Sequence, residues 1–166
     1  MSQHEHKAAA PAAVRVAVLT VSDTRTEATD TSGRTIRSLL EAAGHAVTAA
    51  AIVPDDPDAV TGFVLDQLET AAQVVITTGG TGITSRDSTY EAIDALLEKR
   101  LDGFGELFRM LSYHDIGAAA MMSRACAGLA RGKVVIALPG SEGAVRLAMT
   151  RLVVPELGHL VQQASK

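Results

Sequence analysis

The sequence has little cysteine and few aromatic residues, and each shortage excludes a class of protein or core. Among its 166 residues there is one cysteine, Cys126, so an intrachain disulfide and a cysteine-rich zinc site are both excluded. Aromatic residues make up 3% of the chain, and tryptophan is absent. The core must therefore be built from valine, leucine, isoleucine and alanine. That composition is typical of α/β layers around a largely parallel sheet.

Excess positive charge and long apolar segments are also missing. The formal net charge is −4, which gives no support for nucleic-acid binding. No apolar run approaches the ~20 residues of a membrane span. The length favours a single domain, which we assign to residues 14–166. Residues 1–13 lack a secretory core, so we expect a disordered N-terminal tail and a cytoplasmic protein.

The most informative stretch runs from Val74 to Thr89. It opens with an apolar, β-branched run typical of a buried strand, and it continues with Gly79-Gly80-Thr81-Gly82. Glycine reaches positive φ without steric cost, so this segment can turn its backbone N–H groups toward an anion. Ser88 or Thr89 can cap a following helix that ends near Glu98. The N-terminus of that helix would add its positive end to the same site.

Two familiar phosphate-binding loops do not fit this stretch. No lysine lies between Lys7 and Lys99, which excludes the P-loop, and Ser85 occupies the third glycine position of the dinucleotide fingerprint. A tight strand–helix turn without a ligand stays open as an alternative. Arg86 and Asp87 favour a ligand, because a guanidinium and a carboxylate beside an anion site can bind phosphate and a metal ion.

Polar residues also follow three other predicted strands at their carboxyl ends. The strands are expected over 14–21, 46–53 and 133–138, and the residues that follow them are Ser22 and Asp23, Asp55 and Asp56, and Pro139, Gly140 and Ser141. In a parallel sheet these ends share one edge with Thr78 and the glycine loop. Asp56 before Pro57 is typical of a helix cap, which leaves Asp55 without a capping role. Acidic residues beside amide-lined sites suggest Mg²⁺ bridging to phosphate.

Several helices and one hairpin complete the predicted architecture. Helices are expected to start at Asp30, at Pro57, after Ser141 and at Pro155. The segment 101–111 is amphipathic, and we expect it to face a core with Phe104, Leu107, Phe108 and Leu111. Short apolar segments across Arg131-Gly132 predict a hairpin, so the sheet should be mixed.

Four short motifs, taken in order, resemble a known family. They are Val21-Ser22-Asp23; Thr77-Thr78-Gly79-Gly80-Thr81-Gly82 with Arg86-Asp87; Gly103-Phe104-Gly105-Glu106; and Leu138-Pro139-Gly140-Ser141. In this order and spacing the chain resembles the molybdenum cofactor biosynthesis MoaB/MogA family over roughly residues 14–161. The resemblance implies a three-layer α/β/α fold with a mixed, mostly parallel central sheet, as in molybdopterin-binding domains. It also implies assembly as homotrimers or hexamers.

The resemblance further implies an activity. Family members bind molybdopterin, a pterin dithiolene with a terminal phosphate, and active members adenylylate that phosphate with Mg-ATP and release pyrophosphate. The product is ready for a downstream protein that inserts molybdate. The family's two functional aspartates map onto Asp55 and Asp87, which the resemblance marks as catalytic and as Mg²⁺ ligands. Because the chain keeps both, we expect an active enzyme.

Thirteen residues form the expected substrate site. They are Ser22, Asp23, Thr78, Gly79, Gly80, Thr81, Gly82, Ser85, Arg86, Glu106, Pro139, Gly140 and Ser141. We expect the amides of 79–82 to cradle a phosphate and Arg86 to neutralise charge, whereas Glu106 either orders the loops or is purely structural. Two alternatives stay open: a non-catalytic molybdopterin carrier, and a protein-interaction scaffold on the same fold.

Overall fold

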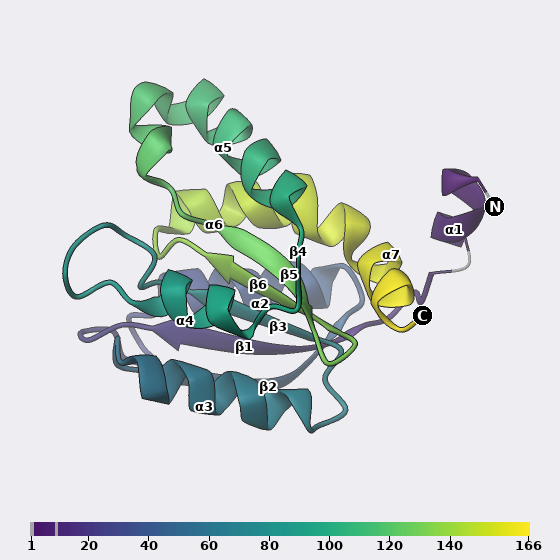
Figure 1. Ribbon diagram of the computed structural model, residues 1–166, viewed down its shortest axis with the longest axis horizontal. Helices are drawn as coiled ribbons and strands as arrows, with labels where there is room; N and C mark the ends of the chain where they lie inside the picture. The colour runs from purple at the N-terminus through teal and green to yellow at the C-terminus, as the bar shows by residue number, and fades with distance from the viewer. Residues whose placement is uncertain (1, 9) are drawn as a thin grey trace.

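The computed structural model, described for residues 2–8 and 10–166, has a central sheet between two layers of helices (Figure 1). The described residues form a six-stranded sheet in the order β2 (Ala46–Val53), β1 (Arg15–Val21), β3 (Val74–Thr78), β6 (Lys133–Leu138), β5 (Cys126–Ala130) and β4 (Lys99–Arg100). The first four strands run parallel, while β5 and β4 pair antiparallel. The predicted α/β fold with a mixed, mostly parallel sheet is confirmed.

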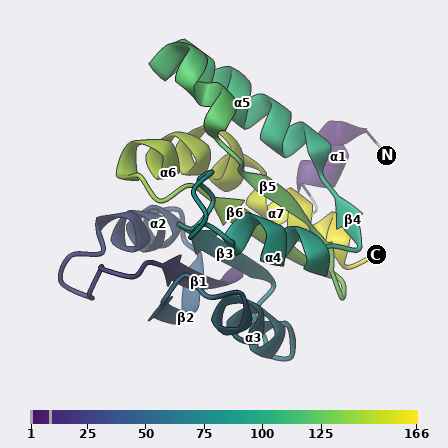
Figure 2. The same ribbon diagram turned by 60° about the vertical axis from the view of Figure 1, so that its left-hand side comes forward.

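Helices cover both faces of the sheet (Figure 2). One face packs against α2 (Thr31–Ala42), α5 (Asp102–Ile116), α6 (Glu142–Ala148) and α7 (Val154–Ala164). The other packs against α3 (Pro57–Leu68) and α4 (Thr89–Leu96). Alternate residues of β1 divide between the two cores: Val16 and Val18 face the first, and Ala17 and Leu19 the second. This alternation follows from the two-residue period of a strand, and the parallel order places the ends of β2, β1, β3 and β6 on one edge.

The two last helices that we predicted are one continuous helical segment. Between α6 and α7 lies a π-helical turn, Met149–Val153, so the chain stays helical from Glu142 to Ala164. Pro155 was expected to start a separate helix because it lacks an N–H and clashes with the preceding turn. The π-helical turn directly before Pro155 accommodates the proline, so the helix continues.

The predicted inner face of α5 was wrong at one position. Phe108 is buried and its ring stacks on that of Phe104, with centroids 6.4 Å apart. Leu107 was also expected in the core, but it is 48% exposed. It points outward because α5 contacts the sheet through a single stripe, and the helix continues into the 3₁₀ turn Gly117–Met122 above the body of the protein.

The N-terminal segment holds a short helix where we expected a disordered tail. Helix α1 spans Gln3–Ala8 and lies beside α7, and Lys7 forms an ion pair with Glu156 (Figure 1). Over the described residues, none of the helices combines the length and apolar character that crossing a membrane requires.

Candidate functional site

A cavity of about 330 Å³ opens where β1, β3 and β6 end. Its lining contains six of the predicted site residues together with four that sequence reasoning did not select. The lining residues are Thr20, Val21, Ser22, Arg25, Ser32, Thr78, Gly79, Gly80, Gly140 and Ser141. The expectation that separate strand ends build one pocket is therefore met for three of the four strands.

Two glycines give the loop after β3 its shape. Gly79 and Gly80 have φ of +98° and +70°. A Cβ on Gly79 would lie 2.1 Å from the carbonyl oxygen of Val21, so only glycine fits there. The N–H of Gly79 donates to the carbonyl oxygen of Leu138 at 3.0 Å, so our prediction that this amide cradles a phosphate was wrong.

The next three amides stay available to a ligand. Within the described part of the chain, the N–H groups of Gly80, Thr81 and Gly82 have no hydrogen-bond partner. The loop therefore supplies donors to an anion, one position later than expected.

The strand end after β6 is held tightly against this loop. Ser32 donates from its hydroxyl to the carbonyl oxygen of Gly140 at 2.6 Å, and Thr78 donates to that of Pro139 at 2.8 Å. Ser141 caps α6 as predicted, since its Oγ accepts the N–H of Ala144. The positive end of α6 thus lies at the cavity that Gly80, with its free N–H, also lines.

Arg25 brings a positive charge to the cavity. Its guanidinium donates to Thr31 Oγ1 at 2.9 Å, and one nitrogen lies 3.9 Å from a carboxylate oxygen of the buried Asp30. These contacts fix a side chain that lines the cavity beside Ser22 and Gly79. Sequence reasoning missed Arg25 because an arginine in a polar loop gives no pattern that separates it from a solvated residue.

Asp55 is the most unusual acid of this edge. It is 7% exposed, and its Oδ1 accepts hydrogen bonds from the Ser88 hydroxyl at 2.9 Å and the Ser88 N–H at 3.3 Å. Its Oδ2 has no partner among the described residues and lies beside Gly80. The residue is buried, but this oxygen is not among the fully buried unpaired atoms of the described residues, so it stays open to a ligand.

Asp87 lies next to Ser88 in the chain and so at the same end of the sheet. Its Oδ2 accepts from the N–H and hydroxyl of Thr84, at 3.0 and 2.7 Å, and this bond closes the loop. Its Oδ1 has no partner within the described ranges. Each of the two predicted acids therefore uses one oxygen for structure, and its other oxygen has no partner among the described residues.

Asp23 and Arg86 form a bidentate ion pair, with N–O distances of 2.8 and 2.9 Å. Asp23 also accepts the N–H of Asp55 at 3.0 Å, so the pair ties three strand-end loops together. The hydrogen bonds from Arg86, and then the one from Asp55, lower the pKa of Asp23 to about 2. Arg86 is thus engaged with a carboxylate, whereas we expected it to face a phosphate.

We expect this pair to be visible in a titration. In wild type the Asp23 carboxyl should titrate near pH 2, and in Arg86→Gln its pKa should rise toward about 3.9. Since the folded pKa is depressed, the linked stability is present above about pH 4 and is lost as pH falls toward 2. Carbon-detected NMR measures both values. Asp94, paired with Arg100, is the control and should not shift in Arg86→Gln; an unmoved Asp23 would contradict the pairing.

Comparison with known proteins decides the family. The model of a family described as a probable molybdopterin binding domain matches residues 17–159. The chain belongs to this molybdopterin-binding domain family. It is 55% identical over 162 residues to molybdenum cofactor biosynthesis protein B of Bacillus cereus. The matched residues cover 96% of this chain and 96% of that protein. It is 52% identical to the protein of the same name from Bacillus subtilis, over 100% of this chain and 99% of that one.

Solved structures of the family agree with the fold. A crystal structure of molybdenum cofactor biosynthesis protein B superposes with a TM-score of 0.91 at 54% identity, covering 93% of this chain and 98% of that chain. The tungsten cofactor synthesizing protein MoaB from Pyrococcus furiosus superposes with a TM-score of 0.86 at 39% identity, covering 95% and 100%. The resemblance to the MoaB/MogA family is therefore confirmed.

Ser85 and Glu106 were also predicted as site residues, but neither lines the cavity. Ser85 is exposed at the tip of the loop. Glu106 lines a different cavity of about 210 Å³ together with Tyr90, Arg109 and Cys126. Burial raises the pKa of the Cys126 thiol to about 12, so this cysteine is not a ready nucleophile.

Arg124 supports the glycine loop from outside, and sequence reasoning missed it. Its guanidinium donates to the carbonyl oxygens of Thr81 and Gly82, pairs with Glu91 and lies 5.0 Å from the ring centroid of Tyr90. This places a charge behind the loop, where it fixes the direction of the peptide groups. The signal for such a residue is three-dimensional, because its partners are more than 30 positions away in the sequence.

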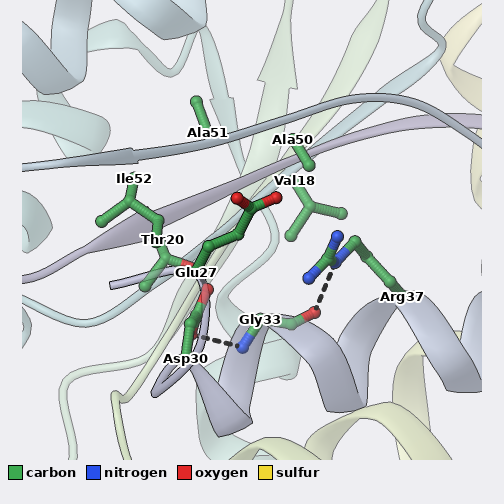
Figure 3. Close-up of a pocket in the computed structure, with 9 residues that line it drawn as sticks. All are labelled: Val18, Thr20, Glu27, Asp30, Gly33, Arg37, Ala50, Ala51 and Ile52. Carbon is green, nitrogen blue, oxygen red and sulfur yellow. Dashed lines mark hydrogen bonds between the residues drawn. The ribbon is translucent and has the colours of Figure 1, made fainter. Parts of the chain in front are cut away.

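A third cavity, also of about 330 Å³, lies on the α2 side of β1 and β2 (Figure 3). It shares Thr20 with the first cavity, and its polar side chains include Glu27 and Arg37. Asp30 uses both oxygens here, accepting from the hydroxyl of Thr20 at 2.6 Å and from the N–H of Gly33 at 2.9 Å. Asp30 is therefore a structural cap of α2 and not a free ligand.

Proposed function

We propose that the protein binds molybdopterin and transfers an adenylyl group from Mg-ATP to its terminal phosphate. In this reaction an oxygen of the molybdopterin phosphate forms a bond to the α-phosphorus of ATP, and the bond to the leaving pyrophosphate breaks. Several negative charges meet in this step, so positioning and electrostatic stabilisation carry most of the catalysis. The site must therefore offer both anion donors and a place for a cation.

One observation carries this proposal: a buried carboxylate with an unpaired oxygen lies beside an amide-lined cavity. Asp55 Oδ2 supplies the first feature, and the free N–H of Gly80, which lines the cavity, supplies the second. Neither feature alone requires a nucleotide. Together they suit a metal–phosphate pair, because the carboxylate can bind the cation and the backbone amides can donate hydrogen bonds to the phosphate.

The residues present fit Mg²⁺. Among the described residues no group of three histidine, cysteine or acidic side chains comes together as a complete metal cage. Mg²⁺ bound with a nucleotide usually takes only one or two carboxylates and completes its shell with phosphate oxygens and water. Asp55 and Asp87, each with one free oxygen, would hold it, and when bound it would neutralise the charge of the reacting phosphates.

In the proposed reaction, different backbone and side-chain groups of the protein have different roles. The amides of Gly80, Thr81 and Gly82, together with Arg25, bind phosphate oxygens. Ser141 places the positive end of α6 at the same cavity. Asp23 and Arg86 keep the loops in register so that the two acids approach the same ligand.

Measuring pyrophosphate release tests the proposal. With molybdopterin, ATP and Mg²⁺, wild type should release pyrophosphate well above Asp87→Ala, and chelation of Mg²⁺ should stop release in both. If wild type binds molybdopterin but releases no more pyrophosphate than the variant, the chain is a non-catalytic carrier. A stoichiometric protein partner without pterin affinity would instead support a scaffold.

We also propose a homotrimer or hexamer, supported by an exposed apolar face on α5 and the following 3₁₀ turn. Six large hydrophobic side chains there are about half exposed or more: Leu107, Met110, Tyr113, Ile116, Met121 and Met122. Their spacing along α5 places three of them on neighbouring turns of one face, and α5 stands out from the body in Figure 1. A contiguous apolar surface of this kind marks an interaction site.

Placing a charge on that face should dissociate the assembly. We expect Met110→Asp to run as a monomer by size-exclusion chromatography with light scattering, where wild type runs as the oligomer. A charge buried without a partner at an interface is strongly unfavourable. Ser38→Asp, at an exposed position of α2, is the matched control and should keep the wild-type mass. An unchanged mass for Met110→Asp would place the interface elsewhere.

A further inference from the structure

Thr89 carries a buried hydroxyl without a partner, at the first position of α4. The residue is 0% exposed, and its Oγ1 has no hydrogen-bond partner among the described residues. In the described part of the chain, two other buried side-chain oxygens share this property, on Thr77 within β3 and on Gln162 within α7. Thr89 is of interest among these residues because its hydroxyl lies near the carboxylate of Asp55.

The geometry around Gly80 shows how close these groups are. A Cβ built on Gly80 would lie 2.1 Å from Thr89 Oγ1 and 2.9 Å from Asp55 Oδ2. Both unpaired oxygens therefore lie close together against Gly80, which itself lines the first cavity. The N–H of Thr89 donates to the carbonyl oxygen of Gly80 at 2.9 Å and holds this arrangement together.

Ser88 explains why Asp55 presents Oδ2 to this space. Ser88 occupies the N-cap position of α4, but its side chain makes no capping bond. It donates its hydroxyl and N–H to Asp55 Oδ1 instead. A residue that we predicted as a local helix cap thus fixes an acid that is 33 positions away, and only one of the two carboxylate oxygens is left for a ligand.

We propose that the Thr89 hydroxyl is a second protein ligand of the divalent cation held by Asp55. This inference rests on the proposed Mg-ATP function and names a residue that the predicted site did not include. A hydroxyl and a carboxylate sharing one Mg²⁺ beside a phosphate loop is the donor set that P-loop proteins use. The hydroxyl stays unpaired in the free protein because its partner arrives with the nucleotide, and it is buried because Gly80 covers it.

Removing the hydroxyl should separate stability from binding. In Thr89→Val the shape is kept and the unpaired polar group is gone, so the free protein should melt at the same temperature or about 2–4 °C higher. Its affinity for Mg·ATP, measured by isothermal titration calorimetry, should fall about 10-fold. Affinity for ATP in the presence of EDTA should be unchanged, because no cation is then present.

Controls distinguish this inference from the function on which it rests. Thr89→Ser keeps the hydroxyl and should bind Mg·ATP like wild type. If wild type binds no Mg·ATP, the proposed function itself fails. If wild type binds Mg·ATP and Thr89→Val binds it equally well, or loses metal-free ATP to the same extent, the hydroxyl is not a cation ligand and only this inference is overturned.

Discussion

Replacing Asp55 with asparagine should lower kcat for adenylyl transfer by about 100- to 1,000-fold, with a loss of Mg·ATP affinity of only about 10-fold. Asparagine still accepts the hydrogen bonds of Ser88 through its side-chain oxygen, so the loops keep their positions. What is lost is the charge that holds the cation. A charge that positions a metal acts mainly on the transition state, and turnover therefore falls more than binding. Steady-state pyrophosphate release and calorimetry measure the two effects.

Asp56→Asn is the matched control, since the two acids are neighbours. Asp56 is exposed and caps α3, accepting the N–H of Ala59 at 3.1 Å. Because asparagine caps a helix about as well as aspartate, this variant should keep both the stability and the kcat of wild type. An unchanged kcat in Asp55→Asn, with a fall in Asp56→Asn, would show that the wrong carboxylate has been assigned.

Gly79→Ala should destabilise the protein by about 3–5 kcal/mol and remove activity with it. Two costs add. Alanine in the left-handed region costs about 1–2 kcal/mol, and its Cβ would meet the backbone oxygen of Val21 at 2.1 Å, which cannot move without disturbing β1. Urea unfolding of the ligand-free protein measures the loss.

Gly44→Ala measures the backbone part of this effect alone, so the difference between the two variants gives the steric part. Gly44 ends α2 with φ of +87°, so it has the same backbone requirement, but a Cβ there would meet nothing within 4 Å. Its replacement should cost only about 1–2 kcal/mol. Equal losses in the two variants would mean that the contact with Val21 does not constrain the loop.

The sequence was enough to predict the mixed sheet, the glycine loop and the strands other than the short β4, because these depend on local patterns. A nearly continuous apolar run marks β1, and the hairpin at Arg131-Gly132 follows from two strands joined by a tight turn. The caps at Asp56 and Ser141 were also correct, since capping depends on a few neighbouring residues. For the same reason the edge that carries the site could be predicted.

The hydrogen bonds and ion pairs within the site could not be predicted, because they depend on contacts between segments that are distant in the sequence. Local preference predicts Ser88 as a helix cap, yet its hydroxyl bonds Asp55 from another strand. Gly79 was assigned a free amide, but the end of β6 takes that N–H. Arg25 donates to the carbonyl oxygen of Gly140 and Arg124 to that of Thr81, and these distant partners come together only when the sheet forms. Conflicts between local preference and tertiary contacts are expected at functional sites.

A crystal structure with Mn²⁺ and a non-hydrolysable ATP analogue tests the central claim most directly. The claim predicts analogue phosphates in the cavity lined by Arg25 and Gly80, with the anomalous signal of the metal at coordinating distance from Asp55 Oδ2. Phosphates bound in the cavity of Glu106, or a metal that does not contact Asp55, would contradict it.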